Sequence, residues 1–195
     1  MNIGDYILAI DEHELKAGDN YWKFYNAVPG RDLIENHFKK ALIIDQRFNP
    51  GGGIDQELLQ ILGQRQYQVT RSRDSIDITR PQRAFFGPMV VMQNERSTSD
   101  AEVFPDGFRT LGLGKVGGVT TYGAVIGTGS YRLMDGSQIR TPGSGLWNVK
   151  GYNLENYGVP PDVYVDNTPE DFLKGSDAQL EKAVEILKEE LREQR

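Results

Sequence analysis

The sequence predicts an α/β fold in which a mostly parallel sheet is flanked by helices. Residues 41–45 (ALIID) and 88–94 (PMVVMQN) are short apolar runs with the length and composition of buried strands. The second run precedes an amphipathic segment, residues 100–114, and a further strand candidate, residues 115–121. A strand–helix–strand order of this kind predicts a crossover between parallel neighbours.

The elements can be justified in chain order. Residues 4–15 (GDYILAIDEHEL) alternate apolar and polar side chains around a turn, which predicts a β-hairpin. Residues 33–40 have apolar positions in helical spacing and lead directly into the strand at 41–45. The helix predicted within 100–114 ends at Gly114 and carries one apolar face. That face consists of Ala101, Phe104, Phe108 and Leu111.

Two helices near the C-terminus are predicted from their capping residues. Thr168 followed by Pro169 marks the start of the first helix. Ser176, with Gln179 three residues later, forms a capping box that begins the second. The second helix has an apolar stripe formed by Leu180, Val184, Leu187 and Leu191. This stripe predicts that the helix packs along one side.

Composition excludes several classes of function. The chain has no cysteine, which rules out thiol nucleophiles, disulfides and cysteine-based zinc sites. It has 28 acidic and 22 basic residues, a net charge of -6, and no basic stripe that would predict nucleic-acid binding. No apolar run has the length of a membrane span, and the N-terminus does not have the pattern of an export signal. We therefore expect a cytoplasmic chain with neither a membrane nor a nucleic acid as its partner.

Three consecutive glycines follow the first buried strand in the motif DQRFNPGGG, residues 45–53. Glycines at the carboxyl end of a strand let the backbone present free N–H groups to a ligand, as an oxyanion hole requires. A phosphate loop is excluded, because no Gly-Lys-Ser/Thr follows and the run has no basic partner. A plain turn between strand and helix remains the alternative.

A second polar motif, NERSTSDAEVFP, follows the next strand and opens the predicted helix. A serine there lies at the positive end of the helix dipole, which suits a nucleophile whose product is an anion. The same position also suits an ordinary N-cap residue. Ser97, Thr98 and Ser99 all meet these conditions, so the motif alone does not choose among them.

The motifs NPGGG, SDAE and NLENYGVPPD occur in this order, and together they resemble the tail-specific and tricorn protease family. The resemblance implies a sheet of the Clp protease and crotonase kind. It also implies a serine endopeptidase that cleaves peptides or unfolded polypeptides through an acyl-enzyme intermediate. Ser99 would be the nucleophile, and the N–H groups of Asp100 and of Gly51 or Gly52 would form the oxyanion hole. The resemblance implies no metal or cofactor, and it leads us to expect a homo-oligomer.

The general base separates two branches of this family. Tail-specific proteases carry a lysine in a TxGK segment after the serine, whereas this chain has Ala124 in TYGAV. The chain therefore resembles the tricorn branch, in which a carboxylate in a segment like NLENYG orients a histidine that precedes the PDZ domain. Glu155 matches that carboxylate. His13 and His37 do not match the family position of the histidine, so the resemblance places the general base outside the chain.

The opening GDYILAIDEHEL is similar to the middle of a PDZ domain. This similarity predicts a partial PDZ-like segment at residues 1–32 and a catalytic domain at residues 33–195, without the rest of the PDZ domain that relatives carry between them. Two other functions remain open. One is a non-catalytic peptide-binding or scaffold fragment of the same fold, and the other is crotonase-type acyl-CoA chemistry. Trp147 and Tyr152 are candidates either for lining a substrate channel or for packing.

Overall fold

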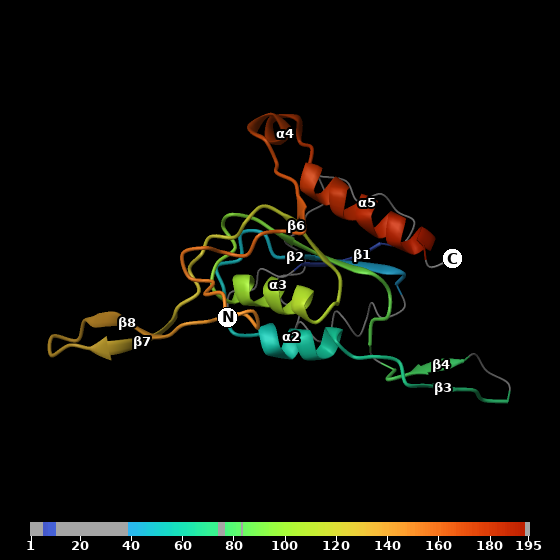
Figure 1. The fold of residues 1–195 in the computed structure, drawn as a ribbon, viewed down its shortest axis with the longest axis horizontal. Helices are drawn as coiled ribbons and strands as arrows, with labels where there is room; N and C mark the ends of the chain where they lie inside the picture. The colour runs from blue at the N-terminus through green and yellow to red at the C-terminus, as the bar shows by residue number, and fades with distance from the viewer. Residues whose placement is uncertain (1–5, 11–38, 74–76, 83, 194–195) are drawn as a thin grey trace.

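The fold is built on a five-stranded sheet with the strand order β1-β2-β5-β6-β9 (Figure 1). The structure is a computed structural model that describes residues 6–10, 39–73, 77–82 and 84–193. The strands are β1 (Tyr6–Ile10), β2 (Ala41–Asp45), β5 (Met89–Gln93), β6 (Lys115–Gly118) and β9 (Val163–Tyr164). The last four are parallel, and β1 runs antiparallel to β2 at one edge. This arrangement confirms the predicted α/β fold with a mostly parallel sheet.

Helices cover both faces of the sheet, as Figure 1 shows. The helices are α2 (Asp55–Leu62), α3 (Asp100–Thr110), the short α4 (Pro169–Lys174) and α5 (Ala178–Glu193). Because successive side chains of a strand point to opposite faces, Leu42 and Ile44 pack with α2 and α3, whereas Ala41 and Ile43 pack with α5. Phe108 of α3 is fully buried in the first of these cores, which stabilises the fold by about 2 to 3 kcal/mol.

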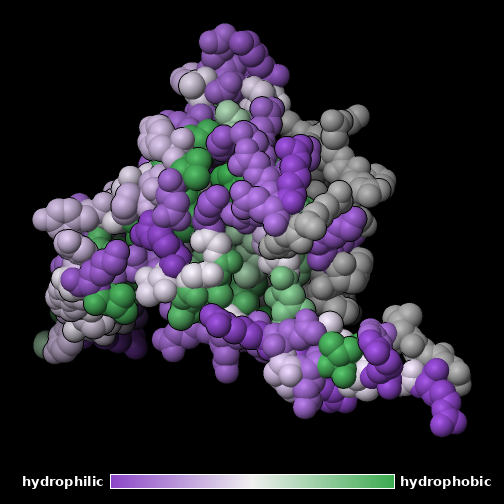
Figure 2. Space-filling view, turned by 45° about the vertical axis from the view of Figure 1, so that its right-hand side comes forward, coloured by the Kyte–Doolittle hydropathy of each residue, from purple (hydrophilic) through white to green (hydrophobic). Residues whose placement is uncertain are grey.

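Two small hairpins extend from this body in different directions (Figure 1). They are β3 (Gln68–Thr70) with β4 (Ile78–Arg80), and β7 (Gly127–Arg132) with β8 (Gln138–Ser144). On the face shown in Figure 2, hydrophilic side chains predominate and hydrophobic ones appear in small groups among them. In the described part of the chain, no helix has the length and apolar character needed to cross a membrane.

Several predictions at the N-terminus concern residues outside the described ranges. The second arm of the predicted hairpin, residues 33–38 of the helix predicted at 33–40, both histidines and the proposed domain boundary between residues 32 and 33 all lie there. The last two residues of that predicted helix, Lys39 and Lys40, are described and form a bend. The first arm is a strand, β1, and its described partner is β2 of the main sheet. The PDZ-like segment and the two-part division of the chain therefore stay predictions.

Helix α3 accommodates a proline in its interior. Pro105 has no N–H, so the carbonyl of Ala101, four residues earlier, loses its helical hydrogen bond. The side chain of Gln46 replaces that bond, because its Nε2 donates to the Ala101 oxygen at 2.9 Å. The helix is thus tied to the loop that follows β2.

The predicted apolar face of α3 is confirmed for Ala101, Phe104 and Phe108, which are buried. Leu111 lies beyond the end of the helix and is 51% exposed.

The predicted N-terminal cap is confirmed for α4 and is wrong for α5. Thr168 caps α4, and its side chain accepts a hydrogen bond from the N–H of Asp171. For α5 the prediction of Ser176 as the cap is wrong, because the helix begins at Ala178 and the carboxylate of Asp177 accepts from the N–H of Leu180. Two arginine–carboxylate contacts of 2.8 Å to Arg47 hold Asp177 in that position.

Candidate active site

The carboxyl ends of β2 and β5 bring the two predicted motifs together. Parallel neighbours end at the same edge of a sheet, so the loops that follow them are adjacent. The N–H of Thr98 donates to the carbonyl of Asn49 at 3.0 Å, and the N–H of Phe48 donates to Asn94 Oδ1 at 2.9 Å. The hydroxyl of Ser97 donates to the carbonyl of Gln46 at 3.0 Å. These bonds fix the glycine loop against the start of α3.

The structure distinguishes between the candidate serines. Ser97 is fully buried, and its hydroxyl is part of the bonding between the two loops. Ser99 is half-buried at the N-terminus of α3, with φ 58° and ψ −119°. Non-glycine residues rarely adopt a positive φ, and such strain, of order 1–3 kcal/mol, concentrates at functional sites. Of the two serines, Ser99 has the exposure and the backbone conformation that a nucleophile at a sharp strand-to-helix turn requires.

Gly51 is the residue of the glycine loop that approaches Ser99 most closely. Its φ is +101°, and a methyl group added at its Cα would lie 2.6 Å from Ser99 Cβ and 2.9 Å from the carbonyl oxygen of Thr98. A side chain is therefore excluded at this position both by conformation and by space. At Gly53, in contrast, no atom lies within 4 Å of such a methyl group.

The candidate oxyanion-hole amides differ in their hydrogen bonding. The N–H of Gly51 donates to Asn49 Oδ1 at 2.9 Å. The N–H groups of Gly52 and Asp100 make no hydrogen bond with any other residue in the described ranges. The structure thus contains two backbone donors beside Ser99 that are available to a ligand.

The side chain of Asp100 lies next to a second carboxyl group. Asp100 Oδ2 accepts a hydrogen bond from the N–H of Ile54 at 3.0 Å, and its carboxyl group also hydrogen-bonds with the side chain of Asp55. Burial, followed by this contact with Asp55, raises the pKa of Asp100 from 3.8 to about 6. Asp100 therefore changes its charge in mildly acidic solution.

Glu155 lies in the loop before β9 and is anchored to the chain near Ser99. Its Oε2 accepts hydrogen bonds from the N–H groups of Val125 at 2.6 Å and Ile126 at 3.0 Å. Its Oε1 accepts none from the residues that the structure describes. The N–H of Ser99 in turn donates to the carbonyl of Ala124 at 3.0 Å. Residues 124–126 thus connect the predicted nucleophile with the predicted carboxylate.

Sequence reasoning assigned no role to Glu102, whose side chain contacts the turn at Ser99. Its side chain is fully buried, and its Oε1 accepts a hydrogen bond from the N–H of Ser99 at 3.1 Å. A serine at the N-cap followed three residues later by glutamate is the spacing of a capping box. That spacing in SDAE could have identified the contact with Ser99, although not the contacts with residues 121–124 described below.

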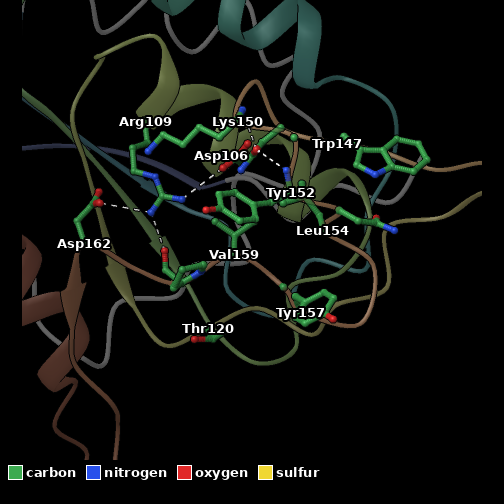
Figure 3. Close-up of a pocket in the computed structure, with 15 residues that line it drawn as sticks. Asp106, Arg109, Thr120, Trp147, Lys150, Tyr152, Leu154, Tyr157, Val159 and Asp162 are labelled. Atoms are coloured by element: carbon green, nitrogen blue, oxygen red, sulfur yellow. Dashed lines mark hydrogen bonds and ion pairs between the residues drawn. The ribbon is translucent and has the colours of Figure 1, made fainter.

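A pocket of about 920 Å³ opens beside the second half of α3 (Figure 3). Trp147 and Tyr152 line it and are 60% and 67% exposed, so neither serves mainly to pack the core. Arg109 lies at the pocket between two carboxylates, as Figure 3 shows. Ser99 and Glu155 are not among the described residues that line this pocket, so its aromatic walls lie beside the candidate site and do not form it.

Comparisons with known proteins show a similarity in sequence and in fold. The sequence model of Peptidase family S41 matches residues 15–165. The tricorn protease of Thermoplasma acidophilum is 37% identical over 164 residues, which cover 83% of this chain and 15% of that protein. Tricorn protease homolog 1 of Streptomyces coelicolor is 38% identical over 158 residues, which cover 80% of this chain and 15% of that protein. A crystal structure of the tricorn protease matches with a TM-score of 0.78 at 35% identity, covering 83% of this chain and 16% of that one. The chain thus spans about 15% of the length of these curated relatives.

Proposed function

Because the chain belongs to peptidase family S41, we propose that it is a serine peptidase whose nucleophile is Ser99. The observation that carries the proposal is the conformation of Ser99. It combines a positive φ with a position at the N-terminus of a helix and a glycine loop packed directly against it. A strained turn of this kind exposes a hydroxyl to substrate while the backbone around it stays fixed. An N-cap serine with no other role would not need that strain.

In the proposed reaction, Ser99 Oγ attacks the carbonyl carbon of a peptide bond. A new C–O bond forms, and the carbonyl oxygen becomes an oxyanion. Collapse of this intermediate breaks the C–N bond, and the amine leaves with the proton that the general base took from Ser99. Water then hydrolyses the acyl-enzyme that remains. The N–H groups of Asp100 and Gly52 are the best donors for the oxyanion, because neither makes a hydrogen bond with other described residues. Gly51 is less suitable, since its N–H already donates to Asn49.

The serine proton requires a general base, and we propose a histidine that Glu155 orients. One oxygen of Glu155 is occupied by two backbone N–H groups, which fixes the carboxylate, and Oε1 is left to accept from an imidazole N–H. The histidine lies outside the described residues, and neither His13 nor His37 matches the family position. Ala124 occupies the position of the lysine in the tail-specific branch, so a lysine base is not part of the proposal.

Peptides or unfolded polypeptides are the proposed substrates, because backbone donors and a half-buried serine suit an extended chain better than a folded surface. A homo-oligomeric assembly is also proposed, on the resemblance to the tricorn branch alone. The relatives matched by this chain are far longer than it is. The substrate class and the homo-oligomer are therefore proposed for this chain and are not taken from the whole relatives.

A fluorophosphonate probe tests the proposal, because it labels only serines that are activated for nucleophilic attack. In the protein that supplies the general-base histidine, we expect one label per chain, located at Ser99 by peptide mass spectrometry, and no label on the Ser99→Ala variant. Ser137→Ala, at an exposed turn between β7 and β8, is the matched control and should label like the parent. An unlabelled parent would favour the non-catalytic scaffold, and acyl-CoA turnover that survives Ser99→Ala would favour crotonase-type chemistry.

A further inference from the structure

The buried carboxylate of Glu102 connects the turn at Ser99 with a segment more than twenty residues away. Its Oε2 accepts hydrogen bonds from the hydroxyl of Thr121 and the N–H of Gly123, both at 2.6 Å. Its Oε1 accepts from the N–H of Ala124 at 2.8 Å and from the N–H of Ser99 at 3.1 Å. The side chain is fully buried, so bulk solvent does not reach its two oxygens.

Glu102 forms no ion pair with a lysine or arginine in the described part of the chain. Burying a carboxylate without a cationic partner is costly unless hydrogen bonds satisfy it. Here four donors converge on its two oxygens, and three of them are backbone N–H groups. An apolar residue at this position would leave the hydroxyl of Thr121 and the N–H groups of Gly123 and Ala124 without this acceptor, and a neutral amide would replace only one of the two oxygens. The carboxylate therefore serves to hold the backbone around it.

The segment that Glu102 holds makes contact with both ends of the proposed site. Ala124 accepts the hydrogen bond from the N–H of Ser99 at 3.0 Å. On its other side, the carbonyl of Gly123 accepts from the N–H of Asn156 at 2.8 Å, next to Glu155 in the sequence. A methyl group at Gly123 would come within 3.1 Å of the Asn156 carbonyl carbon, so the two segments are in close contact. A displacement of this segment would thus move Ser99 and Glu155 relative to each other.

We propose that Glu102 is a positioning residue, which maintains the strained backbone of Ser99 and sets its position relative to Glu155 by locking residues 121–124 between them. This inference rests on the proposed function of Ser99 for its catalytic consequence, but the locking itself does not depend on activity. Glu102 does not touch the substrate in this scheme. It acts through the backbone of the residues that do.

The Glu102→Gln variant tests the proposal with little change in volume. One of the two oxygens becomes an NH₂ group, which faces two donors and can accept from neither. Asp171→Asn is the matched control, because Asp171 occupies the same position in the capping box of α4, where it accepts from Thr168. Both variants are made in the full chain. The rate of fluorophosphonate labelling at Ser99, the melting temperature and amide hydrogen exchange are then measured.

For Glu102→Gln we expect labelling at Ser99 to slow about tenfold or more, which corresponds to roughly 1.4 kcal/mol in the activation barrier. The amides of Gly123 and Ala124 should exchange faster, while those of Val90 and Val91 in β5 stay protected. Asp171→Asn should change neither the rate of labelling at Ser99 nor the exchange of the amides of Gly123 and Ala124. Labelling at the parental rate, or unchanged exchange at Gly123 and Ala124, would overturn the proposal. Loss of protection throughout β5 would also overturn it, since Glu102 would then be a general core residue. If the parent itself is not labelled, the proposed function fails, and hydrogen exchange still decides the locking role.

Discussion

The Gly51→Ala variant tests the close approach of the glycine loop to Ser99. Alanine at a φ of +101° is strained by roughly 1–3 kcal/mol. Its methyl group would also lie 2.6 Å from Ser99 Cβ, and relieving such overpacking costs about 1–3 kcal/mol. The lower entropy of alanine in the unfolded chain offsets about 0.4–1 kcal/mol of this. We therefore expect the free energy of unfolding to fall by about 3 kcal/mol.

Gly53→Ala is the matched control within the same run of glycines. No atom lies within 4 Å of the added methyl group, and the φ of Gly53 lies outside the positive range, so we expect a change of at most about 1 kcal/mol.

Denaturant unfolding measures both variants, and the loss for Gly51→Ala should lower the melting temperature by roughly 6 to 12 °C. Fluorophosphonate labelling should be lost for Gly51→Ala and kept for Gly53→Ala, because only the first methyl group displaces Ser99. Equal stability of the two variants, or normal labelling of Gly51→Ala, would refute this reasoning.

Three further predictions concern charged groups. Between pH 3.8 and about 6, folded Asp100 keeps a proton that the unfolded chain has released, so stability falls as pH rises through this window. Asp100→Asn should remove this dependence of stability on pH. The effect on the free energy of unfolding is roughly 1 kcal/mol after allowance for solvent screening of a half-exposed group. A melting-temperature difference between variant and parent that is the same at pH 4.5 and 7.5 would contradict this prediction. Glu155→Gln should slow labelling of Ser99 by about a hundredfold or more, because the carboxylate that orients the histidine is lost. Its loss of stability should be small. Unimpaired labelling would show that Glu155 only binds the backbone N–H groups of Val125 and Ile126. Arg47→Met should destabilise the fold by about 3 kcal/mol in chemical denaturation, because it leaves the partly buried carboxylate of Asp177 without the arginine that neutralises its charge. A variant as stable as the parent would show that this ion pair does not contribute to stability.

The charge state of Asp177 gives the last of these predictions its direction. Burial is the largest single influence on this carboxyl group and opposes its ionisation. The hydrogen bond and the charge of Arg47, with hydrogen bonds from Leu180 and Asn167, together outweigh burial and lower the pKa of Asp177. Without Arg47, the group must either stay charged in a partly buried position or take up a proton. Either outcome costs free energy that folding would have to supply.

The sequence by itself determined three of the four parallel strands, namely β2, β5 and β6, together with the helix after β5 and the cap of α4. It did not predict β9. Each of the predicted elements depends on signals within about ten residues, such as a continuous apolar run, a helical stripe or a capping residue. The two polar motifs could be placed at one edge of the sheet for the same reason, because parallel strands end together. Ser99, Glu155 and the oxyanion-hole amides were chosen by resemblance, and their catalytic roles stay proposals.

Only the tertiary structure decided how residues far apart in the sequence share hydrogen bonds. It showed that Ser97 is buried and hydrogen-bonded to the carbonyl of Gln46, whereas Ser99 has the strained backbone conformation. The local motif does not distinguish the two serines. It moved the cap of α5 from Ser176 to Asp177, because Arg47 from another loop holds that carboxylate. The four donors around Glu102 come from Ser99, the N-cap residue of α3, and from residues 121–124, and their convergence depends on the packing of those segments. Short-range patterns carry no information about such contacts, since the partners meet only when the sheet and its loops have formed.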